Sequence, residues 1–285
     1  MKLVTYQASG EPRVGVLRDD GVRDAGIEGD MLAVIEAWDE LKDRLARHVR
    51  RAPVEAEARL LAPLRPRSMR DFLTFEGHLK NAMGSLGRPI AAEWYEVPAY
   101  YKGMPDTVIG DREEIPWPPF TDHLDHELEL AAVIGRRGRD IPREQAMDHV
   151  FGYTIWNDVS ARDVQARELP IGMGPSKAKD WDGSNVLGPC LVTADEVDVS
   201  NLWMSVRVNG ETWGEDTTAH MHHRFPDLIA YASQAQTLYP GEVFGSGTAS
   251  GGSGIELQRQ LAPGDLVELE VQKIGVLSNR VGLRA

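Results

Sequence analysis

The stretch LDHELELAAVIG, residues 124–135, places two glutamates at the start of a long apolar run. Glu127 and Glu129 are two residues apart, so on a β-strand their side chains point to the same face. That face continues with Ala131 and Val133, and the opposite face is apolar as well. A strand that is apolar on both faces belongs in the interior of a protein. The pattern therefore predicts two neighbouring carboxylates at the mouth of a buried strand.

Spacing alone does not single out this pair, because the segment VELEV (residues 267–271) repeats it. Its glutamates, Glu268 and Glu270, are followed on their face by Gln272, whereas the other face is apolar. That pattern is typical of a half-exposed strand with its charges in water. A solvated strand end is also the plainer interpretation of the first pair. If the first pair is buried, a divalent cation would relieve the repulsion between its carboxylates.

A third carboxylate follows in the segment GYTIWNDVSARD, residues 152–163. The pattern predicts a strand that ends at Asp158 and passes directly into a helix. Asp158 or Ser160 could cap this helix by accepting hydrogen bonds from its first backbone N–H groups. Alternatively, Asp158 could join Glu127 and Glu129 in a hard-cation site with open positions for a substrate.

The overall composition is that of an ordinary globular protein. The 285 residues are 42% hydrophobic and 26% charged, and the formal net charge is −13. This acidic balance argues against nucleic acid or an anionic membrane as a partner, since both require a basic surface. The single cysteine, Cys190, excludes an intrachain disulfide. Neither a signal-peptide pattern nor an apolar run of the roughly 18 residues that cross a bilayer is present, so we expect a cytoplasmic protein.

The order of strand and helix patterns predicts an α+β protein in which strands dominate. Residues 1–63 have the pattern of a small N-terminal α/β domain, with an amphipathic helix at residues 31–49. Prolines near residues 64–68 mark a linker. Residues 64–285 then form a larger, mostly β domain that carries the candidate site. Short helices are predicted within it at residues 142–150, 160–168 and 225–236.

Four segments, in chain order, resemble the fumarylacetoacetate hydrolase family: DHELELAAVIG, FGYTIWNDVSARDVQ, SKAKDWDGSNVLGP and TLYPGEVFGSGTASG. The resemblance covers roughly residues 65–285. It implies a mixed, rolled β-sheet, usually in a homodimer. It also implies a divalent metal in a carboxylate cluster, with Mg²⁺ expected and Mn²⁺ or Ca²⁺ as alternatives. The expected substrate is a small oxo acid or diketone that is broken down in catabolism.

The resemblance assigns the metal ligands. Glu127, Glu129 and Asp158 match three metal-ligating carboxylates of the family. The segment MRDFLTFEGHLKNA, residues 69–82, is similar to one that holds a further metal carboxylate, and Asp71 stands at that position. The cluster implied by the resemblance therefore has four carboxylates.

The resemblance also assigns the remaining site residues. His78, seven residues after the predicted fourth ligand, matches a catalytic histidine, and Glu256 in GSGIELQ matches a glutamate that orients it. Lys179 matches an active-site lysine. The residues that match substrate-contacting polar groups are Arg162, Gln165 and Thr248.

Plainer interpretations exist for several of these residues. His78 stands in a polar, helix-like segment where a lone histidine is usually on the surface. Arg162 could serve only a helix start, and Lys179 could be a surface charge in a loop. Thr248 stands among glycines and could serve only a tight turn.

Other segments bear on the substrate and on access to the site. Leu73 and Leu169 stand where the family hydrolase has a tyrosine and an aromatic hydroxyl, which argues against fumarylacetoacetate itself as the substrate. The segment HMHH, residues 220–223, is more typical of solvated or pocket-rim histidines than of a transition-metal site. Residues 79–97 have the length of a lid, with an ordinary surface loop as the alternative.

We therefore expect a metal-dependent hydrolase that cleaves a C–C bond in a small 1,3-dicarbonyl acid. His78 would take a proton from water, and Glu256 would hold the imidazole, as the acid does in a Ser-His-Asp triad. Lys179 and Arg162 would balance negative charge. The alternatives are an isomerase or decarboxylase/lyase acting on a related 2-oxo acid, and a non-catalytic protein that binds a small acid. A His78–Glu256 contact that faces the metal would favour hydrolysis.

Overall fold

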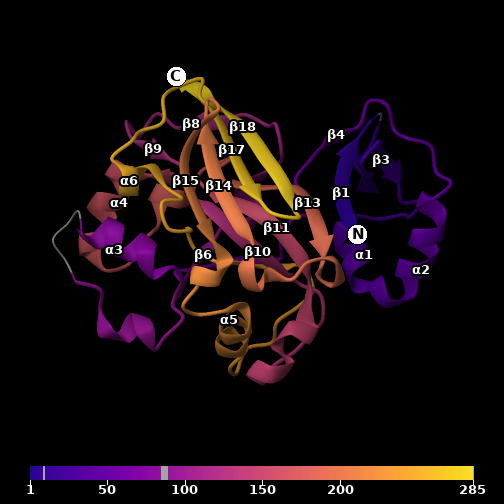
Figure 1. Ribbon diagram of the computed structural model, residues 1–285, viewed down its shortest axis with the longest axis horizontal. Helices are drawn as coiled ribbons and strands as arrows, with labels where there is room; N and C mark the ends of the chain where they lie inside the picture. Colours follow the sequence, from indigo (N-terminus) through magenta and orange to yellow (C-terminus); the bar gives the residue numbers. More distant parts are fainter. Residues whose placement is uncertain (9, 85–88, 285) are drawn as a thin grey trace.

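Strands dominate the fold, as the sequence predicts. The computed structural model describes residues 1–8, 10–84 and 89–284 (Figure 1). In these residues a large mixed sheet has the strand order β3-β2-β1-β13-β11-β10-β16-β5-β6, with β4 beside β1 and β7 beside β13. Its strands are β1 (Lys2–Gln7), β2 (Arg13–Arg18), β3 (Gly21–Asp24), β4 (Arg59–Leu60), β5 (Ser68–Phe72), β6 (Tyr100–Gly103), β7 (Val108–Ile109), β10 (Leu128–Ile134), β11 (Val150–Asp158), β13 (Asn185–Thr193) and β16 (Glu242–Gly245).

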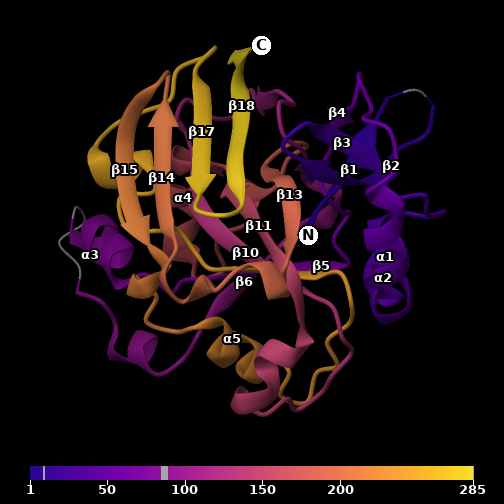
Figure 2. The same ribbon diagram turned by 45° about the vertical axis from the view of Figure 1, so that its right-hand side comes forward.

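A second sheet lies in front of the central strands in both ribbon views (Figures 1 and 2). It has the order β15-β14-β17-β18-β8, and β9 and β12 form a separate short pair. These strands are β8 (Ile115–Trp117), β9 (Leu124–Asp125), β12 (Ser160–Ala161), β14 (Trp203–Val208), β15 (Glu211–Thr217), β17 (Leu266–Val271) and β18 (Gly275–Arg284). Residues alternate between buried and half-buried along β17, which carries VELEV. The interpretation of VELEV as a half-exposed strand is therefore confirmed.

Strand β10 is buried on both faces because a hydrophobic core lies on each side of it. All of its residues are buried. Leu130 and Ala132 belong to the core shared with the second sheet, which contains Leu269 of β17. Ala131 and Val133 belong to the core shared with the N-terminal helices. The apolar run that follows the two glutamates therefore forms the centre of the molecule.

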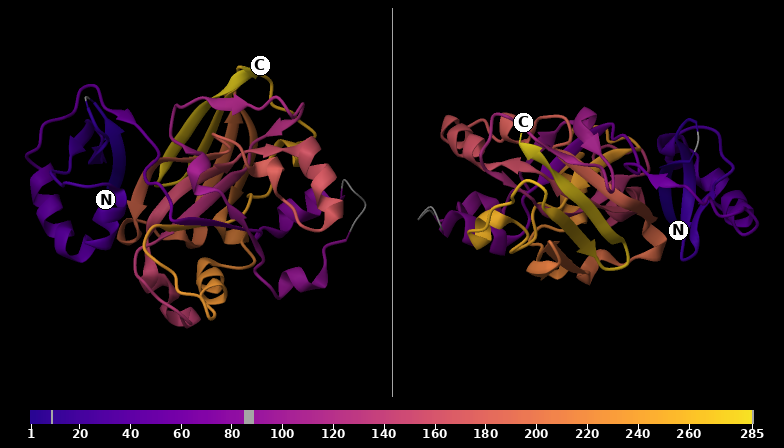
Figure 3. Two further views of the ribbon diagram at one scale, coloured as in Figure 1. Left: turned by 180° about the vertical axis from the view of Figure 1, so that it is seen from behind. Right: turned by 90° about the horizontal axis from the view of Figure 1, so that it is seen from above.

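The N-terminal elements form a lobe at one side of the molecule (Figure 3). Strand β1 of this lobe pairs with β13 and so extends the large sheet. The single helix predicted at residues 31–49 is divided into α1 (Met31–Glu36) and α2 (Trp38–Val49), because the backbone of Ala37 leaves the helical conformation. The domain boundary near residue 63 stays a prediction.

The other helices are short and lie around the sheets. They are α3 (Glu76–Gly84), α4 (Arg162–Glu168), α5 (Phe225–Ala232), α6 (Gly254–Leu257) and a 3₁₀ helix at Arg143–His149 in place of the helix predicted at residues 142–150. Helices α3 and α6 lie together, at the left of Figure 1. None of the helices in the described part of the chain is long and apolar enough to cross a membrane.

The segment predicted as a lid is described only in part, since residues 85–88 lie outside the described residues. Its first part continues α3, and its last part contains a 3₁₀ helix, Ala92–Tyr95. Trp94 of this 3₁₀ helix is buried, and its indole N–H donates to the carbonyl of Leu73 at 2.7 Å. This end of the segment is therefore packed against β5, and its movement as a lid stays a prediction.

Replacing Gly152 by alanine tests the tight pairing of β11 with β13. A Cβ atom at Gly152 would lie 2.2 Å from the carbonyl oxygen of Val192, which is backbone and cannot move aside cheaply. We expect Gly152→Ala to lower the free energy of unfolding by roughly 1–3 kcal/mol in urea titrations. The control is Gly84→Ala at the end of α3, where nothing lies within 4 Å of the added atom. Equal stabilities of the two variants would contradict this account.

Candidate metal centre

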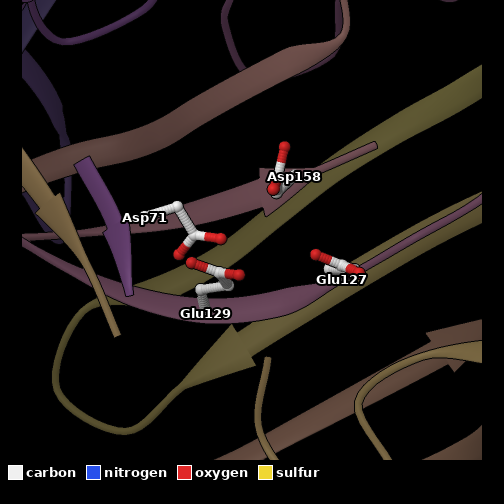
Figure 4. Close-up of side chains that lie close together, drawn as sticks. All are labelled: Asp71, Glu127, Glu129 and Asp158. Carbon is white, nitrogen blue, oxygen red and sulfur yellow. The ribbon is translucent and has the colours of Figure 1, made fainter. Parts of the chain in front are cut away.

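Four carboxylates from separate parts of the chain meet inside the large sheet. Each of them offers an oxygen, and these oxygens all lie within 4.8 Å of one another (Figure 4). Asp71 comes from β5, Glu129 from β10, and Asp158 from the end of β11, and Glu127 directly precedes β10. All four residues are buried, with at most 7% of any of them exposed. The grouping matches the cluster implied by the family resemblance.

The strand order explains how these carboxylates meet. Strand β16 lies between β10 and β5, and its Gly245 is paired with Ala131 on one side and with Asp71 on the other. A Cβ atom at Gly245 would lie 2.6 Å from Glu129 Oε2 and 2.7 Å from the ring of Trp156. The glycine therefore leaves the space that the Glu129 carboxylate occupies.

The cluster is short of hydrogen-bond donors. Within the described residues, both oxygens of Glu129, Oδ1 of Asp71 and Oδ1 of Asp158 are buried and accept no hydrogen bond. Burial, together with Asp71 and Asp158, raises the pKa of Glu129 well above its ordinary value. Burial and then Asp158 raise the pKa of Asp71 in the same way. Because unpartnered buried carboxylates are costly and oxygen ligands suit hard cations, these residues fit a divalent metal.

Two basic side chains compensate the negative charge of Glu127 and Asp158. Lys179 Nζ lies 2.6 Å from Glu127 Oε2 and also contacts Asp158 Oδ2. Arg162 Nη2 lies 2.7 Å from Glu127 Oε1. Burial alone would raise the pKa of Glu127, but Lys179 and Arg162 hold it well below its usual range. Burial would lower the pKa of Lys179, but Asp158 and Glu127 raise it, so Lys179 remains charged.

The plainer interpretations of Lys179 and of Asp158 are wrong. Lys179 is buried and is not a surface charge, whereas Arg162 does stand at a helix start but also contacts Glu127. Helix α4 begins at Arg162, and its N-cap residue, Ala161, makes no side-chain capping bond. Ser160 Oγ donates to the carbonyl oxygen of Asp158 at 3.0 Å, while the Asp158 side chain points into the carboxylate cluster. Neither predicted cap therefore caps the helix.

His78 and Glu256 meet across the contact between α3 and α6. His78 is buried, and its Nδ1 atom lies 2.9 Å from Glu256 Oε2. Glu256 also accepts hydrogen bonds from the backbone N–H of Gly251 at 2.9 Å, from Ser253 Oγ at 2.9 Å and from Asn81 Nδ2 at 3.1 Å. Burial would raise the pKa of Glu256, but the hydrogen bond and charge of His78 hold it below its ordinary value. The predicted contact between His78 and Glu256 is present.

Sequence reasoning missed Tyr101. Its hydroxyl donates to Asp158 Oδ2 at 2.5 Å, and its ring centroid lies 5.5 Å from Lys179 Nζ. Tyr101 reaches the cluster because β6 pairs with β5 and places it opposite Asp71. Burial and then Asp158 raise the pKa of Tyr101 well above its ordinary value, so it stays a phenol and a donor. The segment VPAYYKG predicts a strand, but its partner strand cannot be read from the local pattern.

The predicted substrate-contacting residues lie around this centre to different degrees. Gln165 Oε1 accepts a hydrogen bond from Arg162 Nη1 at 3.0 Å. Thr248 is buried in the glycine-rich loop that follows β16. Leu169, by contrast, is 44% exposed.

The histidines at residues 220–223 are not part of the carboxylate cluster. The Nε2 atoms of His222 and His223 lie 3.0 and 2.9 Å from the backbone carbonyl oxygens of Tyr95 and Trp94. Among the residues that the structure describes, these histidines are not part of any potential metal cluster. They pack against the 3₁₀ helix of residues 92–95, so the interpretation as a transition-metal site finds no support.

Comparison with known proteins identifies what this chain resembles. The family model described as the fumarylacetoacetate (FAA) hydrolase C-terminal domain matches residues 68–282. Human mitochondrial oxaloacetate tautomerase FAHD2A is 40% identical over 189 residues, which are 65% of this chain and 59% of that protein. Oxaloacetate tautomerase YisK of Bacillus subtilis is 34% identical over 235 residues, which are 80% of this chain and 74% of that protein. The match therefore spans less than two thirds of the human relative.

Among solved structures, a fumarylacetoacetate hydrolase from the psychrophilic Exiguobacterium antarcticum aligns with the whole chain. The alignment covers 100% of both chains with a TM-score of 0.83 and 29% sequence identity. The fold predicted from the resemblance is therefore confirmed over the full length of the chain.

Removing one carboxylate tests the metal centre. Glu129→Ala deletes two of the buried, unpartnered oxygens, so we expect Mn²⁺ affinity in calorimetry to fall by more than the roughly 10- to 100-fold typical of outer-shell changes. The matched control is Glu268→Ala, from the segment with the same spacing on the half-exposed strand β17. Unchanged Mn²⁺ affinity in Glu129→Ala would show that the cluster does not bind the cation.

Metal binding should also release protons. Burial and neighbouring carboxylates raise the pKa values of Glu129 and Asp71, so the metal-free cluster keeps protons to a higher pH than ordinary carboxylates do, and a cation must displace them. We therefore expect Mn²⁺ affinity to rise as the pH rises. Calorimetry in buffers of different ionisation enthalpy measures the number of protons released. A binding enthalpy that does not depend on the buffer would contradict the prediction.

Proposed function

Because the chain belongs to the fumarylacetoacetate hydrolase family, we propose that it is a divalent-metal-dependent hydrolase that cleaves a C–C bond in a small 1,3-dicarbonyl acid. The observation that supports hydrolysis is the 2.9 Å approach of His78 Nδ1 to Glu256 Oε2. Water must be activated for hydrolysis, and an oriented imidazole is suited to this task at neutral pH.

Asp71, Glu127, Glu129 and Asp158 would hold the cation, for which we propose Mg²⁺ because all four ligands are carboxylates. The cation would supply polarisation of the substrate carbonyl and stabilisation of negative charge on the fragment that leaves. Lys179 and Arg162 already compensate Glu127, so the oxygens that would chiefly serve the cation are the unpartnered ones of Glu129, Asp71 and Asp158.

His78 is the proposed general base. With its Nδ1 atom 2.9 Å from Glu256 Oε2, the imidazole would take the proton from water at Nε2. Glu256 is ionised, since its pKa is held below the ordinary value, and it therefore stabilises the protonated imidazole. The water oxygen bonds to the carbonyl carbon, and the C–C bond breaks with its electron pair on the leaving carbon. His78 then returns the proton to that carbon, which closes the proton balance.

Lys179 and Tyr101 would keep the cluster in its working geometry. Lys179 contacts both Glu127 and Asp158, and Tyr101 donates to Asp158. Arg162 is held by Glu127 and by Gln165, so we propose that Arg162 and Gln165 form a polar wall for the substrate. Thr248 would add a hydroxyl from the glycine-rich loop.

A second candidate function is the tautomerisation of a 2-oxo acid such as oxaloacetate. It is favoured by the names of the relatives, two of which are oxaloacetate tautomerases at 40% and 34% identity. Tautomerisation moves a proton between carbon and oxygen, and it breaks no C–C bond. His78 could carry that proton with the same geometry, so only the products distinguish the two functions.

The test is a comparison of the wild-type protein with His78→Ala on acylpyruvates, fumarylacetoacetate and oxaloacetate, each with Mg²⁺ or Mn²⁺. We expect the variant to lower kcat by about 10²- to 10⁴-fold, because it removes the base, while Mn²⁺ affinity changes little. The control is His149→Ala, since the side chain of His149 lies outside the carboxylate cluster and makes an exposed contact, at 3.0 Å, with the carbonyl oxygen of Arg136. The readouts are loss of enol absorbance and identification of the products.

The products decide between the two candidates. Hydrolysis in ¹⁸O-labelled water places one label in the new carboxylate and yields two fragments. If the wild-type protein only accelerates the interconversion of enol and keto forms, with an intact carbon skeleton, the tautomerase is supported and the hydrolase proposal is wrong.

A further inference from the structure

Asp125 is a charged residue of the interior that neither the family resemblance nor the carboxylate cluster accounts for. It ends the short strand β9, and none of its surface is exposed. It is not one of the four clustered carboxylates. Each of its oxygens accepts hydrogen bonds, and the partners show what Asp125 holds in place.

One oxygen of Asp125 holds Arg162. The Nε atom of Arg162 donates to Asp125 Oδ2 at 2.8 Å, and its Nη2 atom lies 2.7 Å from Glu127 Oε1. A guanidinium anchored through Nε can present its terminal nitrogens in only a narrow range of directions. Asp125 thus fixes the direction from which Arg162 approaches the metal-site carboxylate Glu127.

Both oxygens of Asp125 hold the start of helix α6. Asp125 Oδ1 accepts from the backbone N–H of Gly254 at 2.8 Å, and Oδ2 accepts from the N–H of Ile255 at 3.1 Å. A Cβ atom at Gly254 would lie 2.7 Å from Asp125 Oδ1, so the glycine permits this approach. Helix α6 carries Glu256, which lies 2.9 Å from His78.

We propose that Asp125 is a positioning residue that joins the two halves of the reaction centre. It connects Glu127, through Arg162, to the His78–Glu256 pair, through α6. In the described part of the chain, no hydrogen bond or ion pair joins Asp125 to His78 or to a clustered carboxylate, so it acts through Arg162 and α6. The function of such a connection is to keep the proton-accepting imidazole at a fixed place relative to the cation site, because small displacements of catalytic groups are costly to rate.

Asp125→Asn is the sharpest variant. An amide of the same shape offers one oxygen and one NH₂ group. In the place of Oδ2, the NH₂ faces the Nε–H of Arg162 and the N–H of Ile255; in the place of Oδ1, it faces the N–H groups of Gly254 and His126. Donor faces donor in either case, so at least one contact with α6 is lost. Asp111→Asn is the matched control. Asp111 is also a buried carboxylate that accepts a hydrogen bond from a backbone N–H, but its donor is Ser278 of β18, at 2.9 Å.

Two readouts are independent of the proposed function. We expect the amides of Gly254 and Ile255 to exchange with solvent at least about tenfold faster in Asp125→Asn than in the wild type. We also expect the ring ¹⁵N signals of His78, which His78→Ala identifies, to report a mixture of the two imidazole tautomers in Asp125→Asn and a single tautomer in the wild type. Asp111→Asn should leave both unchanged. An unchanged His78 tautomer in Asp125→Asn would overturn the proposal even if the substrate assignment is correct.

A third readout rests on the proposed function, because it uses turnover. Asp125→Asn should lower kcat at least about tenfold, and the loss should be largely absent when Glu256→Gln is already present, since both changes act through His78. Additive losses would overturn the proposal. If the protein turns over none of the tested acids, the proposed function is wrong. The amide exchange rates of α6 and the tautomer of His78 then still decide the role of Asp125.

Gly254→Ala gives the same decision if Asp125→Asn does not fold. It keeps the carboxylate, but the added methyl group would lie 2.7 Å from Asp125 Oδ1 and 2.6 Å from the backbone carbonyl oxygen of Arg259. The expected result is again faster exchange in α6 and a mixed His78 tautomer. A variant that keeps the wild-type tautomer would contradict a positioning role for this contact.

Discussion

Repulsion among four carboxylates in one buried space is the constraint on which the site depends. Asp71, Glu127, Glu129 and Asp158 approach within 4.8 Å of one another. The chain compensates them unevenly: Lys179 and Arg162 lie against Glu127, and Lys179 also against Asp158, whereas both oxygens of Glu129 have no donor among the described residues. One side of the cluster is thus neutralised by the protein, and the other side is left for an added cation.

The surrounding fold follows from the need to hold these charges in place. Strand β10 can carry Glu129 into the interior because a hydrophobic core packs on each of its faces. Gly245 on the neighbouring strand leaves the required space. The His78–Glu256 pair lies on two helices outside the sheet, and Asp125 and Arg162 connect it to the cluster. Four carboxylates on or beside strands and a histidine–glutamate pair on helices are thereby joined.

Local patterns predicted the features that depend on local sequence. The apolar run behind Glu127 and Glu129 sufficed to predict a buried strand, and the contrast with VELEV was correct. Asp71 and Glu256 could be placed only through the family resemblance, because the β5–β16 pairing and the α3–α6 contact bring together segments far apart in the chain. Tyr101 was missed for the same reason. The division of the predicted helix 31–49 at Ala37 was missed because neither glycine nor proline marks it.

The measurement that tests the central claim most directly is anomalous diffraction from a crystal of the protein soaked in Mn²⁺. The account predicts one strong anomalous peak among Asp71, Glu127, Glu129 and Asp158, with carboxylate oxygens at roughly the 2.0–2.2 Å expected for a small divalent cation. It also predicts that Lys179 keeps its contact with Glu127. A peak only at His222 and His223, or no peak among the four carboxylates at saturating Mn²⁺, would contradict the account.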